Sequence, residues 1–116
     1  GAYLSGGASN RVIQIEGLST SKRYNIGIFS SNNAGNAVAM TATSGGQTVS
    51  IDGRYNHTFT GYFTNLTPNA QGIITVTLNK GAQSEYMVLN AMVIITSSFH
   101  QVICLQKQSW NQTKSN

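Results

Sequence analysis

Charged residues are scarce in this chain. Lysine, arginine, aspartate and glutamate make up 9% of its 116 residues, whereas an average globular domain carries about 25%. Three residues are acidic and seven are basic, and Lys22 and Arg23 are the one adjacent basic pair. Nucleic-acid-binding domains usually carry a clustered basic patch or stripe. We therefore expect no nucleic-acid partner, and the net charge of +4 mostly reflects the missing acids.

The sequence also lacks cysteine pairs and long apolar runs. Cys104 is the single cysteine, which excludes an internal disulfide. No run reaches the roughly 18 apolar residues that a membrane-spanning helix needs, so we expect no membrane insertion. No signal peptide is visible at Gly1. Low charge together with many Thr, Asn and Gly residues is typical of bacterial secreted and surface proteins, and we expect a secreted or cell-surface location.

Titratable side chains are too few and too dispersed to indicate catalysis. Glu16, Asp52 and Glu85 lie far apart in the sequence, whereas a glycosidase needs two carboxyl groups that flank one bond. His100 and Cys104 would point to the same side of a strand. However, no oxyanion-hole motif accompanies them, and a lone buried cysteine is normally a small hydrophobic residue. We therefore expect a non-catalytic protein.

Motifs for metals and cofactors are equally sparse. His57 and His100 lack the closely spaced ligands of a zinc site. The glycine pairs at 6–7 and 45–46 lack the Lys-Ser/Thr and the following helix of a phosphate-binding loop. We expect no cofactor and no metal site. A structural calcium ion stays an open alternative, because Asp52 or Glu85 with backbone carbonyl groups would supply the oxygen ligands that calcium prefers.

Alternation of apolar and polar residues is the main pattern that is present. It recurs over residues 11–16, 23–30, 37–43, 47–51, 58–63 and 73–79. Residues 88–96 are apolar on both faces, which predicts a central strand covered on both sides, with Leu89, Ala91 and Val93 in one buried row. Turn signals rich in Gly, Asn and Ser separate these runs. About seven short strands with such punctuation predict an all-β, antiparallel β-sandwich.

Three segments carry a resemblance to a known family. Residues 15–26 read as a strand, a turn with Gly17, Leu18, Ser21 and Lys22, and a second strand that begins near Tyr24. Residues 63–76 form a similar strand-loop-strand segment around Pro68, and residues 86–94 follow as a long strand. In this order, the three segments resemble galactose-binding-like β-sandwich modules. Such modules are appended to secreted bacterial polysaccharide-degrading enzymes and to surface adhesins.

The resemblance covers residues 1–96 and implies a jelly-roll sandwich with an accessory, usually carbohydrate-binding role. Modules of this type carry further strands before the first motif, where this sequence has few residues. The resemblance therefore implies a domain that lacks N-terminal strands or is completed by another chain. We predict that residues 1–105 form the sandwich domain and that residues 106–116 form a polar C-terminal tail.

The best binding candidate is the segment 52–57. It combines charge, an aromatic ring and amide groups in Asp52, Arg54, Tyr55, Asn56 and His57. Sugar recognition uses that mixture, because a flat ring stacks on the pyranose face and planar polar groups bind the hydroxyls. Secondary candidates on neighbouring loops are Asn32, Asn33 and Tyr86.

Two functional hypotheses follow from these observations. The leading one is a non-catalytic accessory module that binds polysaccharide or glycan through loops at one end of the sandwich. The alternative is a structural or adhesive module that assembles with other chains through exposed strand edges.

Overall fold

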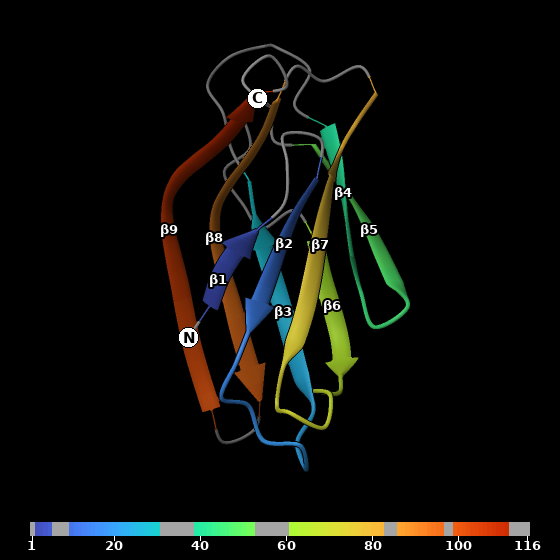
Figure 1. Ribbon diagram of the computed structural model, residues 1–116, viewed down its shortest axis with the longest axis vertical. Helices are drawn as coiled ribbons and strands as arrows, with labels where there is room; N and C mark the ends of the chain where they lie inside the picture. Colours follow the sequence, from blue (N-terminus) through green and yellow to red (C-terminus); the bar gives the residue numbers. More distant parts are fainter. Residues whose placement is uncertain are drawn as a thin grey trace.

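Two antiparallel β-sheets stacked face to face make up the described part of the chain, in a computed structural model (Figure 1). The structure describes residues 2–5, 10–30, 39–52, 61–82, 86–96 and 99–111. Within these ranges there is no helix, and so none that is long and apolar enough to cross a membrane. The predicted all-β, antiparallel sandwich is confirmed.

The described residues form nine strands in two sheets. Sheet A has the order β1 (Ala2–Ser5), β2 (Asn10–Ile15), β7 (Ile74–Lys80), β4 (Ala39–Ser44), β5 (Gln47–Asp52). Sheet B has the order β6 (Gly61–Leu66), β3 (Tyr24–Phe29), β8 (Tyr86–Thr96), β9 (Phe99–Asn111). In Figure 1, β5 and β6 lie on the same side of the sandwich, and β1 and β9 lie on the other.

In the alternating segments 11–16, 23–30, 37–43 and 73–79, the described apolar residues at every second position form rows that point into the core between the sheets. The buried members of these rows are Ile13, Ile15, Tyr24, Ile26, Ile28, Met40, Ala42, Ile74, Val76 and Leu78. Their neighbours on the opposite faces are more exposed, as Asn25 and Thr75 illustrate. The period-two pattern therefore predicts which face of these strands packs inward.

The predicted buried row of β8 is wrong. Its register against β9 shifts between Leu89 and Ala91, and such an irregularity changes which residues point inward. The observed buried row is Met87, Leu89, Met92 and Ile94. Ala91 and Val93 are half-buried on the outer face, and Ile95 is 41% exposed. Although β8 is a central strand, as predicted, its outer face is not fully covered.

The two ends of the sequence contain more strand than predicted. β1 pairs with β2 in a segment where the sequence indicates no strand. β9 continues to Asn111, past residue 105, and its later residues pair with β8, as Gln108 does with Leu89. Backbone pairing requires no apolar side chains. The polar composition of residues 106–111 therefore does not prevent a strand there.

One side of the sandwich is closed by contacts between the edge strands β5 and β6. The Gln47 amide donates to the Thr64 carbonyl oxygen at 2.6 Å and accepts from the Thr64 backbone N–H at 3.0 Å. Above this pair, the two strands approach so closely that a Cβ at Gly61 would lie 2.9 Å from the Val49 side chain. These contacts satisfy the Thr64 backbone groups at the edge of sheet B and join the two sheets.

Candidate functional site

The predicted loop site lies only in part within the described residues. Asp52 is exposed at the end of β5 and lines a hollow of about 290 Å³ together with Met40, Ile51 and Gly81. Outside the described residues lie Arg54, Tyr55, Asn56, His57, Asn32 and Asn33. Tyr86 begins β8 and its backbone pairs with Asn111, but its side chain also lies outside what is described.

The strands that border these predicted segments run to one end of the sandwich, which is the upper end in Figure 1. β3 and β5 end toward it and β8 begins there. The binding role of the segment 52–57 stays a prediction.

A larger hollow, which we call the lower hollow, lies at the opposite end on the outer face of sheet B. Its volume is about 530 Å³, and its lining is Ser21, Lys22, Arg23, Asn25, Asn65, Ile95 and Thr96. These residues come from the turn before β3, from β3 itself and from the ends of β6 and β8. The sequence reveals the adjacent cations Lys22 and Arg23, but it does not indicate that they meet the other lining residues.

Hydrogen bonds within the β2–β3 connection hold the turn that carries the two cations. The Ser19 backbone N–H donates to the Tyr24 hydroxyl oxygen at 2.9 Å, and the Lys22 N–H donates to the Ser19 carbonyl at 3.2 Å. The Ser19 hydroxyl also accepts from the Ser21 N–H at 3.3 Å. Because Tyr24 is buried in the core, its hydroxyl anchors this turn to the sandwich. The turn motif found in the sequence therefore has a structural role.

The β6–β7 connection packs against the β2–β3 connection and stabilises the same end. The Leu18 N–H donates to the Gly72 carbonyl at 3.0 Å. Within the β6–β7 loop, the Asn69 side-chain oxygen accepts from the backbone N–H groups of Gln71 at 2.9 Å and Ile73 at 3.0 Å. Both connections at the lower end are thus held by specific backbone contacts, so the lower hollow has a fixed frame.

A bulge in sheet B brings Asn65 to the lower hollow. The register of β3 with β6 shifts between Tyr24 and Ile26, and Asn65 in the opposing stretch has a φ of 55°. Asparagine adopts this left-handed conformation more readily than most residues. The Asn65 N–H donates to the Asn25 side-chain oxygen at 2.9 Å. This bond fixes the orientation of the Asn25 carboxamide at the hollow, because its oxygen faces β6.

Apolar surface continues from the lower hollow along the outer face of sheet B. Ile95 pairs with Asn25, and two residues further along β3 the outward-facing Gly27 pairs with Tyr62 and with Val93. The Tyr62 side chain is 56% exposed. Gly27 has no side chain of its own, but it is buried. Neighbouring residues therefore shield the Gly27 backbone from solvent. Polar groups at the hollow and an exposed aromatic residue thus lie on one face.

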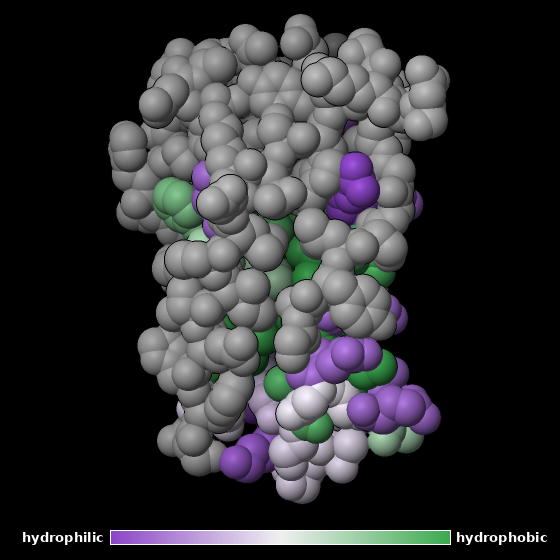
Figure 2. Space-filling model, turned by 60° about the vertical axis from the view of Figure 1, so that its left-hand side comes forward, coloured by the Kyte–Doolittle hydropathy of each residue, from purple (hydrophilic) through white to green (hydrophobic). Residues whose placement is uncertain are grey.

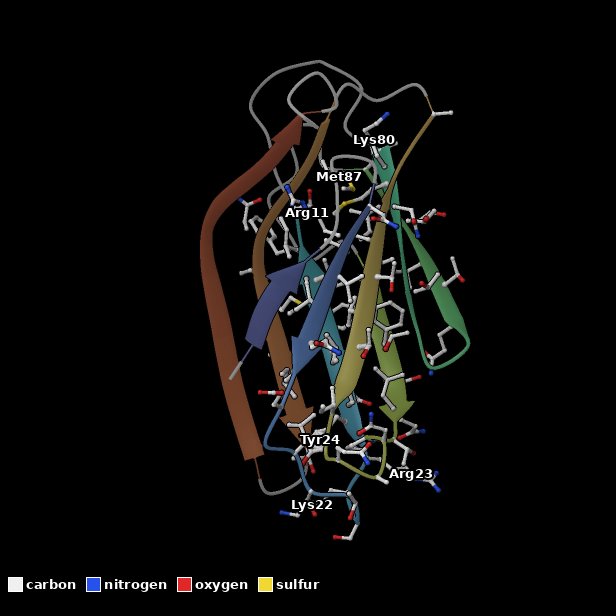
Figure 3. The ribbon with its side chains drawn as sticks, viewed as in Figure 1. Arg11, Lys22, Arg23, Tyr24, Lys80 and Met87 are labelled. Atoms are coloured by element: carbon white, nitrogen blue, oxygen red, sulfur yellow. The ribbon has the colours of Figure 1, made fainter. Side chains whose placement is uncertain are left out.

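Charge at the lower end is predominantly positive. Lys22 and Arg23 extend to opposite sides of this end (Figure 3). Strongly hydrophilic residues gather here beside apolar surface in the space-filling view (Figure 2). Glu16 lies on the same connection, whereas Asp52 is at the upper end. The two acids therefore do not flank a common substrate, and Glu85 lies outside the described residues.

Metal-ligating side chains do not gather in the part of the chain that the structure describes. No group of three His, Cys, Asp or Glu residues there lies close enough to hold an ion. The lining of the lower hollow consists of amide, hydroxyl, cationic and apolar groups. Such groups bind a ligand through hydrogen bonds, charge and apolar contact.

Comparison with protein-family models, with curated proteins and with solved structures finds no match for this chain. Its function therefore has to be inferred from its own residues and fold.

Proposed function

We propose that this domain is a non-catalytic module that binds carbohydrate through the lower hollow and the adjoining outer face of sheet B. The observation that carries the proposal is the composition of that surface. Asn25 and Asn65 supply carboxamides and Ser21 and Thr96 supply hydroxyls, next to the exposed side chain of Ile95. Sugars present hydroxyl groups around an apolar ring face, so they need polar and apolar partners side by side.

Tyr62 extends this surface beyond the hollow. It lies on the outer face of sheet B, in register with Gly27, and Asn25 is the next outward-facing residue of β3 toward the hollow. A saccharide chain longer than one unit would contact the amides with one unit and the aromatic side chain with the next. Exposed aromatic side chains of this kind offer an apolar face to a ligand and a polar group to water.

The fold is compatible with the wider hypothesis of a galactose-binding-like accessory module. The strand pairs are nested along the chain: β4 pairs with β5, β3 with β6, and β2 with β7. A long hairpin that rolls up on itself pairs its strands in this order. Rolled antiparallel sandwiches include the jelly rolls of lectin domains. This topology supports a jelly-roll relative as a proposal, and a secreted or cell-surface role in a bacterium remains part of the same proposal.

A polysaccharide-binding screen with matched variants tests the proposal. We expect the purified domain to bind at least one glycan of a broad array. Tyr62→Ala should weaken that binding about two- to twelvefold, because an aromatic contact contributes about 0.5–1.5 kcal/mol. Thr48→Ala changes an exposed residue of β5 and serves as the control.

Tyr55→Ala in the same screen tests the predicted loop site. Binding that is lost in Tyr55→Ala and kept in Tyr62→Ala would move the site to the segment 52–57 and leave the function standing. The absence of binding to any glycan would contradict the carbohydrate-binding function itself.

Assembly through β9 is a second candidate function, and one observation favours it. β9 is a 13-residue edge strand that pairs with β8 alone among the described strands. A long edge presents backbone N–H and C=O groups that can pair with another strand. Such addition of a strand is a common mode of protein recognition.

Paired proline variants test this second function. Successive residues of a strand direct their backbone N–H groups to opposite sides of the strand. Proline has no backbone N–H, so of Gln101→Pro and Val102→Pro one variant loses an N–H that faces β8 and the other loses an N–H that faces the open edge. If β9 mediates assembly, sedimentation velocity should show oligomers of the native domain, and one of the two variants should be a folded monomer. A native domain that stays monomeric at high concentration would rule out self-assembly by this edge.

A further inference from the structure

Charge at the lower hollow stands out against the composition of the chain. The chain carries only seven lysine and arginine residues, and two of them, Lys22 and Arg23, line this one hollow. The remaining polarity of the chain comes mostly from neutral side chains, since charged residues are 9% of the total. Two adjacent cations beside a concave polar surface are therefore a local feature of this end of the fold.

The directions of the two cations indicate the shape of a ligand. Lys22 and Arg23 extend to opposite sides of the lower end instead of converging on one point (Figure 3). A single small anion would be held best by converging donors. Cations that flank a hollow lined by Asn25 and Asn65 are better suited to an extended ligand with negative groups on more than one unit.

The backbone that carries the cations is already ordered before a ligand binds. Ser19 bonds both to the Tyr24 hydroxyl and to the Lys22 N–H, and the connection is tied to the neighbouring loop by Leu18 and Gly72. The backbone at Lys22 and Arg23 therefore needs no reordering when a ligand binds. A preorganised frame of this kind reduces the entropy lost when a ligand binds.

We propose that the ligand of the lower hollow is an acidic polysaccharide, with carboxylate or sulfate groups that pair with Lys22 and Arg23. This inference rests on the proposed carbohydrate-binding function and specifies its substrate class. The neutral amides and Ile95 contact the sugar rings, and the two cations select chains that carry anionic groups. An arginine pairs with carboxylate or sulfate through two parallel hydrogen bonds, whereas a lysine acts as a compact point charge.

Matched polymers separate the charge from the sugar. Binding is measured to polygalacturonate and to its methyl-esterified form, and to dextran sulfate and unmodified dextran. We expect the acidic polymer of a pair to bind more tightly, and added salt to weaken that preference because it screens exposed charges. Preference within the first pair alone identifies carboxylate as the source of the negative charge, and preference within the second pair identifies sulfate.

Single charge-removing variants place the selectivity at the hollow. Lys22→Gln and Arg23→Gln should each weaken binding to the acidic polymer about two- to fivefold, as expected for exposed ion pairs. Lys80→Gln removes the same charge at the upper end, where Lys80 bonds to the Gly81 carbonyl, and should leave binding unchanged. Thermal unfolding of all three variants confirms that the fold is kept.

Each other outcome overturns a defined part of the proposal. Equal binding of acidic and neutral polymers would contradict the acidic ligand and leave carbohydrate binding in place. Equal losses in Lys22→Gln and Lys80→Gln would show a general effect of net charge and no site at the lower hollow. If no polymer or arrayed glycan binds, the proposed function fails together with this inference.

Discussion

At the scale of single residues, the lower end of the sandwich depends on backbone conformations that few residues adopt. Gly17 and Gly72 have φ angles of 78° and 77°, and Asn65 has 55°. Each lies in the left-handed region that favours glycine and, to a lesser extent, asparagine. These three positions shape the two connections and the bulge that surround the lower hollow.

The two glycines allow a matched test of that dependence. A Cβ at Gly72 would lie 2.5 Å from the Leu18 carbonyl oxygen, whereas a Cβ at Gly17 would have no atom within 4 Å. Gly17→Ala should lower the free energy of unfolding by about 1–2 kcal/mol through φ strain alone. Gly72→Ala should lower it further, by about 2–4 kcal/mol in total, because a backbone atom must also move.

Urea unfolding of both variants checks this prediction. Equal losses of unfolding free energy in Gly17→Ala and Gly72→Ala would mean that the close contact between the β2–β3 and β6–β7 connections does not form. The sequence alone indicates turns at both glycines, and their positive φ angles agree with it. The sequence does not indicate the left-handed conformation of Asn65, because that conformation depends on the pairing of β6 with β3.

At the scale of strands, local alternation predicts the inward face wherever a strand pairs regularly. β2, β3 and β7 bury their inward-facing apolar residues as expected. The register shift between β3 and β6 does not change the inward face of β3, because the extra residue lies in β6. β8 departs from this rule at the register shift beside Leu89. That shift arises in the pairing with β9, which lies outside residues 88–96, so inspection of residues 88–96 alone cannot locate it.

The observed inward face of β8 leads to a stability prediction, for which the next residue on the outer face serves as the control. Met92 is fully buried, whereas Val93 is half-buried on the outer face. Met92→Ala should reduce the free energy of unfolding by about 2–5 kcal/mol, because it leaves a cavity in the core. Val93→Ala should reduce it by only about 1 kcal/mol or less, because the side chain is partly solvated. Chemical denaturation measures both values, and a larger loss of unfolding free energy at Val93 would restore the buried row of Leu89, Ala91 and Val93 that the sequence predicts.

At the scale of the whole molecule, the candidate site is a product of strand order. Lys22 and Asn25 are near neighbours in the sequence, but Asn65 and Ile95 reach them only because β6, β3 and β8 are adjacent in sheet B. Composition and spacing identify the sandwich and the adjacent cations. They do not specify which strands are neighbours, and for that reason the sequence directs attention to the segment 52–57 instead.

The lower hollow and Asp52 lie at opposite ends of the sandwich, which makes a site at either one easy to separate from the other. The lower hollow adjoins the β2–β3 connection, whereas Asp52, the described residue of the segment 52–57, ends β5 at the upper end (Figure 1). A ligand that binds one end leaves the other unaffected. Residue-resolved binding data therefore distinguish the two sites in a single experiment.

The most direct test is an NMR titration of the isotope-labelled domain with an oligogalacturonate, followed through the backbone amide signals. We predict that the largest shifts occur at the turn residues Ser21 and Lys22, at Asn25 and Asn65, and at Thr96, with little change near Asp52. Shifts confined to the segment 52–57, or no shifts at any concentration of either the oligogalacturonate or a dextran sulfate oligosaccharide, would contradict an acidic-glycan site at the lower hollow.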